Sequence, residues 1–196
     1  MTKAGILYVV ATPIGNLGDV SLRALEVLKA ADAIYCEDTR HSRKLCERYS
    51  IGTPLHPYHE HNAEKQRPLM LRQLEDGKNL ALISDAGTPL ISDPGYKLVA
   101  EARESEIDIV PIPGACAAIT ALCAAGLPSD RFFFAGFLPP KEQARRNALH
   151  ELAELPACTL IFYESPKRLA KMLTDAAQCL GGDRAAVLAR ELTKQF

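Results

Sequence analysis

Short apolar runs alternate with longer amphipathic stretches through the first 112 residues. The short runs are rich in β-branched and aliphatic residues, which is typical of buried strands. We expect strands at 6–11, 32–36, 55–58, 80–83 and 107–110. The stretches between them repeat their apolar residues at helical spacing, and predict helices at 22–30, 42–49, 64–76 and 96–104. Strands that alternate with helices indicate an α/β fold with a parallel-rich sheet.

The pattern changes after the sequence Pro111–Gly114, where we expect a tight turn. The residues that follow predict a helix at 115–125 that is apolar nearly all round, and then an aromatic strand at 132–137. A basic helix, a second strand at 159–163, another helix at 167–179 and a last strand at 185–190 come next. We therefore predict two α/β domains, residues 1–112 and 113–196.

The predicted last strand runs toward Phe196 with no further element to pair with it or cover it. A thin layer of two or three strands does not easily bury its apolar face, and an unpaired edge strand promotes association. We therefore expect the second domain to be incomplete, and the chain to associate or to exchange strands.

Composition excludes several classes of protein. The chain has 196 residues, of which 47% are hydrophobic and 24% charged, and its net charge is -1, so no global positive field attracts nucleic acid. Any polyanionic partner must be bound by local basic patches. The six cysteines have no paired spacing, and Cys36, Cys116 and Cys158 lie in or beside apolar runs, which favours free thiols in a reducing compartment. With no signal peptide and no membrane-spanning run, we expect a cytoplasmic enzyme that contacts no membrane.

The loop at 84–95 is the first candidate for a ligand site, because ligands of open α/β sheets bind outside the carboxyl ends of the strands. Gly87 and Gly95 permit a close approach to the main chain, while Pro89 and Pro94 stiffen the loop. An ordinary connecting loop is the alternative. The loop after the first strand has the spacing G-x-x-G and no G-K-[ST], so it is neither a dinucleotide fingerprint nor a P-loop.

Two polar segments follow strand ends. Glu37, Asp38 and Arg40 come directly after the second strand, where both helix capping and a functional site are plausible. His56, His59 and His61 have the spacing H-x-x-H-x-H, but a proline-broken loop without a further ligand favours a polar wall over a metal site. We therefore expect no metal.

Several blocks of sequence resemble the tetrapyrrole (corrin/porphyrin) methylase superfamily, and within it the ribosomal RNA small subunit methyltransferase I branch. The blocks occur in fixed order at 7–17, 37–40, 59–62, 84–95, 113–114, 125–132, 162–165 and 190–194. Thr88 stands where the wider superfamily has the aspartate of a Gly-Asp-Pro loop. This departure disfavours a porphyrin-like substrate and fits the RNA branch.

The resemblance implies two α/β domains with S-adenosylmethionine in the cleft between them, and a homodimer. It implies methylation of the 2′-hydroxyl of a cytidine in small-subunit (16S) ribosomal RNA. Two alternatives remain open: a methylase of a small tetrapyrrole-like molecule, and a regulatory module that binds the cofactor without catalysis. The 2′-hydroxyl distinguishes RNA from DNA, which disfavours a DNA substrate.

The sulfonium of the cofactor is already electrophilic, so the protein has to orient the reactants and exclude water. Glu37 and Asp38 are candidates for the base, and Arg40 for a grip on an RNA phosphate. The expected cofactor-binding residues are Pro13, Gly15, Asp85, Ala86, Gly87, Thr88, Pro89, Ile91, Pro113, Gly114, Cys116, Ala117, Tyr163 and Glu164.

Three basic clusters follow strand ends and are candidates for phosphate contacts, with solvated helix faces as the alternative. They are Arg40, Arg43, Lys44 and Arg48; Lys141, Arg145 and Arg146; and Lys167, Arg168 and Lys171.

Overall fold

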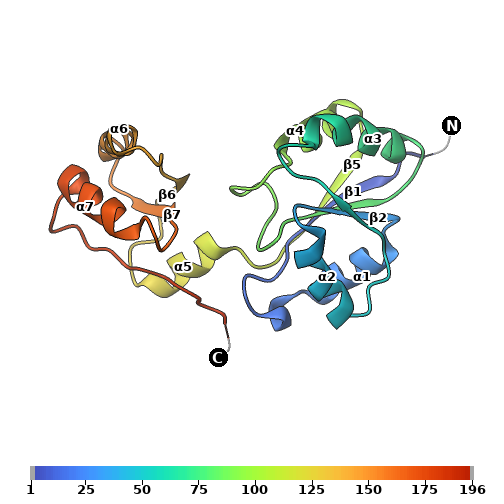
Figure 1. The fold of residues 1–196 in the computed structure, drawn as a ribbon, viewed down its shortest axis with the longest axis horizontal. Coiled ribbons are helices and arrows are strands. Elements are labelled where there is room, and N and C mark those ends of the chain that lie inside the picture. The colour runs from blue at the N-terminus through green and yellow to red at the C-terminus, as the bar shows by residue number, and fades with distance from the viewer. Residues whose placement is uncertain (1–2, 195–196) are drawn as a thin grey trace. The chain divides into compact units, whose positions relative to one another are not determined.

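A computed structural model describes residues 3–194 of the chain (Figure 1). The described residues divide into two compact units. The first contains residues 3–116 together with Thr193 and Lys194, and the second contains Ala117–Leu192. Each unit has its own sheet and its own helices.

The first unit is built on a five-stranded parallel sheet with the order β3-β2-β4-β1-β5. Its strands are β1 (Ile6–Val10), β2 (Ala33–Cys36), β3 (Leu55–Pro57), β4 (Leu80–Ile83) and β5 (Asp108–Ile112). The five strands that the apolar runs predict are therefore confirmed. The expected turn at 111–114 is wrong in its first half, because β5 continues through Pro111 to Ile112. Proline is tolerated there because β5 is an edge strand, which has one side without a partner.

Helices cover both faces of this sheet, and so bury β2 and β4 completely. On one face, α1 (Leu22–Ala30) and α2 (Thr39–Arg48) bury side chains such as Leu28 and Leu45 against β1, β2 and β4. On the other face, α3 (Ala63–Glu75) and α4 (Tyr96–Glu104) bury Met70 and Leu98. A single turn of 3₁₀ helix, Leu17–Asp19, precedes α1. Because all five strands are parallel, their carboxyl ends lie at one edge of the unit.

The second unit contains a two-stranded parallel sheet of β6 (Phe132–Phe137) and β7 (Thr159–Tyr163). Its helices are α5 (Ala117–Ala125), α6 (Glu142–Ala153) and α7 (Leu169–Leu180). Leu149 of α6 and Met172 of α7 belong to a small apolar core. Beside it, the side chain of Arg145 forms a buried ion pair with Asp175, whose Oδ2 lies 2.6 Å from the guanidinium.

Two expectations for the second unit are wrong. The helix expected to be buried nearly all round, α5, buries only Ala118 and Leu122, while Ile119 is 44% exposed. The strand expected at 185–190 is irregular and exposed, although Val187 and Leu188 favour strands. Strand propensity needs a surface to pack against, and these residues have none in the described chain. The end of that expected element, 195–196, lies outside the described residues.

Candidate functional site

The loops that follow β1 and β4 are joined into one structure at the carboxyl edge of the first unit. Thr12 and Gly87 exchange both of their backbone hydrogen bonds, at 2.9 and 3.0 Å. The hydroxyl of Thr12 also donates to the carbonyl of Ser84 at 3.1 Å. Gly87 has a φ of 86°, and a Cβ added to it would lie 3.3 Å from Ile14 Cγ2. Glycine is therefore needed there both for conformation and for space.

The loop after β5 joins the same structure. The Thr88 hydroxyl donates to the carbonyl of Ala115 at 3.1 Å, and Ala11 N donates to the carbonyl of Ile112 at 3.2 Å. A Cβ on Gly114 would approach Ala11 Cβ to 2.9 Å. The expected cofactor residues that follow β1, β4 and β5 are thus brought to one edge of one sheet.

The segment after β2 is tied to this edge by Asp38. Its backbone N donates to Asp85 Oδ1 at 3.0 Å. Its carboxylate caps α2, accepting from Arg40 N at 2.8 Å, and forms two further bonds with the Arg40 guanidinium at 3.1 and 2.8 Å. These bonds from Arg40 lower the pKa of Asp38 to about 2. Because of the cap, α2 begins at Thr39, three residues earlier than expected.

Asp93 lies in the opposite electrostatic environment. Burial, and then the nearby charges of Glu37 and Asp85, raise the pKa of Asp93 to about 6. A small cavity of about 10 Å³ is lined by Glu37, Tyr58, Leu82, Ile83, Ser84, Pro89, Asp93 and Pro94. The sequence placed Asp93 in the candidate loop but did not single it out, because its burial and the nearness of Glu37, which follows another strand, depend on the fold.

The backbone of this loop departs from ordinary conformations at two residues that are not glycine. Leu90 has a φ of 73° and Ser92 a φ of 62°. Such conformations cost free energy, and they occur often at functional sites. Among the other expected cofactor residues of the unit, Pro13 and Pro89 are buried, Ala86 is exposed and Ile91 is 39% exposed.

Gly15 contacts a segment that the expected list of site residues omitted. Its φ is 137°, and a Cβ added to it would lie 2.9 Å from Lys194 Cγ and 3.3 Å from Thr193 Oγ1. The Thr193 hydroxyl is buried and makes no hydrogen bond within the described residues. The only signal for this segment in the sequence was the similarity of 190–194 to a known family.

The remaining expected cofactor residues, Ala117, Tyr163 and Glu164, belong to the second unit. The Tyr163 hydroxyl accepts a hydrogen bond from Ala118 N at 3.1 Å, and the ring packs against Phe134 at 4.9 Å. The Glu164 side chain is 5% exposed and lies 3.0 Å from Arg168. Both side chains are therefore held firmly in the second unit, beside the first turn of α5 and the end of β7.

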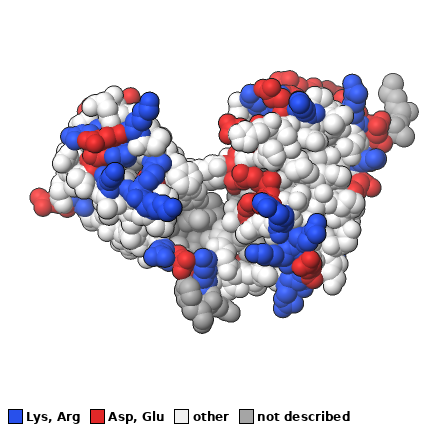
Figure 2. Space-filling view, in the orientation of Figure 1, with Lys and Arg blue, Asp and Glu red and all other residues white. Residues whose placement is uncertain are grey.

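The three basic clusters differ in their surroundings. The side chain of Arg145 is buried, forms an ion pair with Asp175 and donates to the carbonyl of Pro140 at 3.1 Å. The expectation of a phosphate contact is therefore wrong for this residue. The Arg168 guanidinium forms an ion pair with Glu164 and donates a hydrogen bond to the carbonyl of Leu138. In α2, by contrast, all four cationic side chains are exposed, and Figure 2 shows Lys and Arg gathered over this helix.

No group of three or more His, Cys, Asp or Glu side chains suited to a metal ion occurs in the described part of the chain. The histidine segment is organised by Asn62, whose side chain accepts from His59 N at 2.9 Å and donates to the carbonyl of Pro57 at 3.0 Å. Among the described helices, none has both the length and the apolarity needed to cross a membrane.

Comparison with known families decides the identity of this fold. The model of the Tetrapyrrole (Corrin/Porphyrin) Methylases matches residues 6–196. The chain belongs to the tetrapyrrole methylase family. Among curated members, it is similar to proteins named "Ribosomal RNA small subunit methyltransferase I", with 57% identity to that of Mesorhizobium japonicum over 97% of this chain and 64% of the relative.

A further relative and two solved structures agree with this family. The protein of the same name from Escherichia coli O157:H7 is 56% identical over 98% of this chain and 67% of its own length. The chain thus spans about two thirds of the length of the curated relatives it matches. Among solved structures, diphthine synthase has a TM-score of 0.66 at 17% identity, covering 88% of this chain and 72% of that one. Uroporphyrin-III-C-methyltransferase from Thermus thermophilus has a TM-score of 0.63 at 22% identity, covering 89% and 73%. These two structures support the tetrapyrrole methylase fold.

Proposed function

We propose that the protein is an S-adenosylmethionine-dependent methyltransferase that methylates the 2′-hydroxyl of a cytidine in small-subunit (16S) ribosomal RNA. The observation that carries the proposal is the joining of four strand ends into one site, in a chain 55–57% identical to relatives named for this RNA. We further propose that it acts in the cytoplasm as a homodimer, without a metal.

The residues present fit the cofactor. Gly87 and Gly114 let the loops after β1, β4 and β5 pack closely, because a Cβ on Gly87 would crowd Ile14 and one on Gly114 would crowd Ala11. The Asp85 carboxylate, which already accepts from Asp38 N, offers further acceptor capacity for its polar edges. When bound, S-adenosylmethionine supplies an electrophilic methyl group. We place it against the fourteen expected cofactor-binding residues.

The protein's own carboxylates then have to receive the proton of the attacking hydroxyl. Asp38 is poorly suited to this, because Arg40 occupies both of its oxygens and lowers its pKa. Asp93 is better matched, because a pKa of about 6 leaves it ionised but basic at neutral pH. We therefore propose Asp93, beside Glu37, as the proton acceptor, and Asp38 as the residue that positions Arg40.

Arg40 suits a role on the RNA side of the site. Its side chain is 89% exposed, and Asp38 fixes its guanidinium while leaving further donors free. We expect Arg40→Ala to lose methyl transfer while it retains affinity for S-adenosylmethionine. Arg103→Ala, at an exposed position of α4 that has no proposed role, is the control for a general loss of positive charge. Loss of cofactor affinity in Arg40→Ala would contradict this assignment.

The decisive assay is transfer of labelled methyl from S-adenosylmethionine to small ribosomal subunits, followed by nucleoside analysis for 2′-O-methylcytidine. Label in that nucleoside is the expected result. Label on a tetrapyrrole and none on RNA would favour a small-molecule methylase. Cofactor binding without transfer to either substrate would favour a regulatory module.

A further inference from the structure

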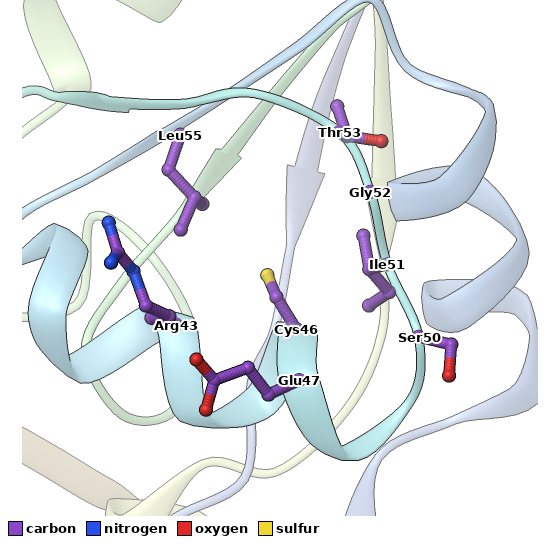
Figure 3. Close-up of a pocket in the computed structure, with 8 residues that line it drawn as sticks. All are labelled: Arg43, Cys46, Glu47, Ser50, Ile51, Gly52, Thr53 and Leu55. Atoms are coloured by element: carbon purple, nitrogen blue, oxygen red, sulfur yellow. The ribbon is translucent and has the colours of Figure 1, made fainter.

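A second cavity of the first unit lies along α2, away from the joined loops (Figure 3). It is an open hollow of about 520 Å³, lined by Arg43, Cys46, Glu47, Ser50, Ile51, Gly52, Thr53 and Leu55. Cys46 and Ile51 belong to the buried core and form an apolar floor. Figure 3 shows Arg43 and Glu47 on the α2 side, with Leu55 across from Arg43. The cavity therefore combines an apolar interior with one cation and one anion.

The two charged groups of this cavity have no ion-pair partner among the described residues. Both side chains are exposed. Arg43 is also part of the basic surface of α2, with Arg40, Lys44 and Arg48. A positive surface that borders an apolar cavity is complementary to a nucleic-acid strand, whose phosphates are anionic and whose bases are flat and largely apolar.

We propose that this cavity receives an unpaired nucleobase of the RNA substrate, close to the methylated nucleotide, and favours a base with an exocyclic amine. The inference rests on the proposed function. Proteins read single-stranded RNA by splaying bases into pockets, stacking them on aromatic rings or arginine planes, and hydrogen-bonding their edges. The Arg43 guanidinium provides a plane for stacking, and the Glu47 carboxylate provides an acceptor.

The acceptor determines which bases fit. A carboxylate accepts a hydrogen bond from the amine of cytosine, and the same chemistry applies to adenine and guanine. Uracil has no exocyclic amine. Glu47 therefore discriminates against uridine at this position, while the apolar floor of Cys46 and Ile51 contacts the ring of any base.

The position of the cavity along α2 suits a neighbouring nucleotide. Arg40 stands in the first turn of the helix, beside the joined loops, and Glu47 is seven residues further on. At about 1.5 Å per residue these positions are about 10 Å apart along the axis. This distance is of the order of one or two nucleotides, so one strand can follow the basic surface from the reacting ribose to the cavity.

The test adds bulk at one residue that lines the cavity, without disturbing the fold. A Cβ on Gly52 meets no atom within 4 Å, and its φ lies outside the left-handed region, so Gly52→Leu is expected to fold. Gly182→Leu, in equally open space in the second unit, is the matched control. Binding is measured to fluorescent RNA decamers of adenosine, cytidine or uridine at fixed salt. We expect Gly52→Leu to weaken binding of the adenosine and cytidine decamers about tenfold, with an unchanged dependence on salt.

A second variant tests base choice separately from the shape of the cavity. The unsubstituted chain should bind the adenosine and cytidine decamers several-fold tighter than the uridine decamer. Glu47→Gln should reduce this difference, because an amide can also donate to a uracil carbonyl. Equal binding of all three decamers, binding of none, or a Gly52→Leu variant that binds like the control would each overturn the inference.

Failure of this inference is distinguishable from failure of the proposed function. If the chain methylates small ribosomal subunits and Gly52→Leu leaves decamer binding unchanged, only the base pocket is wrong. If the chain transfers no methyl group to RNA but its decamer affinity depends on Gly52 and Glu47, the pocket stands and the proposed reaction is wrong.

Discussion

Two aspartates near the same sheet edge have pKa values that are shifted in opposite directions. Asp38 is paired with Arg40, so its pKa falls to about 2, whereas Asp93 is partly buried near two other carboxylates, so its pKa rises to about 6. The sequence shows both residues in segments that follow strands, and it gives no means to predict their different pKa values. Their roles depend on which side chains the fold brings beside them.

Asp93→Asn tests the raised pKa through stability. A carboxyl group with a raised pKa in the folded state favours folding when it is protonated. This contribution is complete below the ordinary value of 3.8 and is lost as the pH rises through about 6. The asparagine variant should therefore match the unsubstituted protein near pH 3.5 and exceed its stability at pH 8 by about 1 kcal/mol, after a discount for solvent screening. Urea unfolding at the two pH values measures the difference.

The same variant tests the proposed proton transfer. Methyl transfer by the unsubstituted protein should rise with pH through about 6 and then level off. Asp93→Asn should transfer slowly and lose this rise. A variant with full activity and an unchanged pH profile would exclude Asp93 as the base.

At the scale of the elements, the sequence predicts the first sheet well, because each buried strand is a short apolar run between helical patterns. The start of α2 is less accurate, since a cap depends on a side chain that can also serve a site. The candidate loop at 84–95 was found from its glycines and prolines. Its bonds to Thr12 and Ala115 were not predictable, because they join segments more than 25 residues apart.

Gly87→Val tests the joined loops. Valine disfavours a φ of 86° and crowds Ile14, so the Thr12–Gly87 bridge should open. We expect affinity for S-adenosylmethionine, measured by calorimetry, to fall at least tenfold. Gly52→Val, in open space, should keep the affinity. A folded Gly87→Val variant with unchanged affinity would remove this loop from the cofactor site.

The ion pair between α6 and α7 allows a second test at this scale. Arg145→Met leaves Asp175 buried with only the weaker contact to Arg146, at 3.9 Å. We expect this change to lower the free energy of unfolding by about 3–5 kcal/mol. Arg145→Met combined with Asp175→Leu should cost much less, because no buried charge is left alone. Denaturant unfolding followed by circular dichroism provides the measurement, and equal losses in the two variants would contradict a buried-pair role.

At the scale of the whole molecule, the second unit was predicted less well than the first. Its aromatic strand and β7 were recognised from composition, but the last strand was not formed and α5 proved half-covered. Apolar composition indicates how much apolar surface a segment has, but it does not indicate which other segment packs against that surface. In the described chain, the large apolar side chains Phe132, Phe133, Phe137 and Leu173 of this unit are all exposed by 43–58%.

These exposed side chains lead to a prediction of self-association. Exposed large apolar side chains favour association, so the molar mass from light scattering should rise with protein concentration. Phe137→Ser combined with Leu173→Ser should reduce the rise, while Leu22→Ser, at an exposed site in the first unit, should not. A strictly constant monomer mass would contradict this prediction.

The paired bonds between Thr12 and Gly87 also determine how the joined loops move. Their amide hydrogens are anchored to a central strand of the sheet, so they should exchange with deuterium almost as slowly as the amides of β1 and β4. A binding loop that is already ordered loses little conformational entropy when its ligand arrives. This part of the molecule therefore behaves as a rigid platform, and any opening and closing must occur elsewhere in the chain.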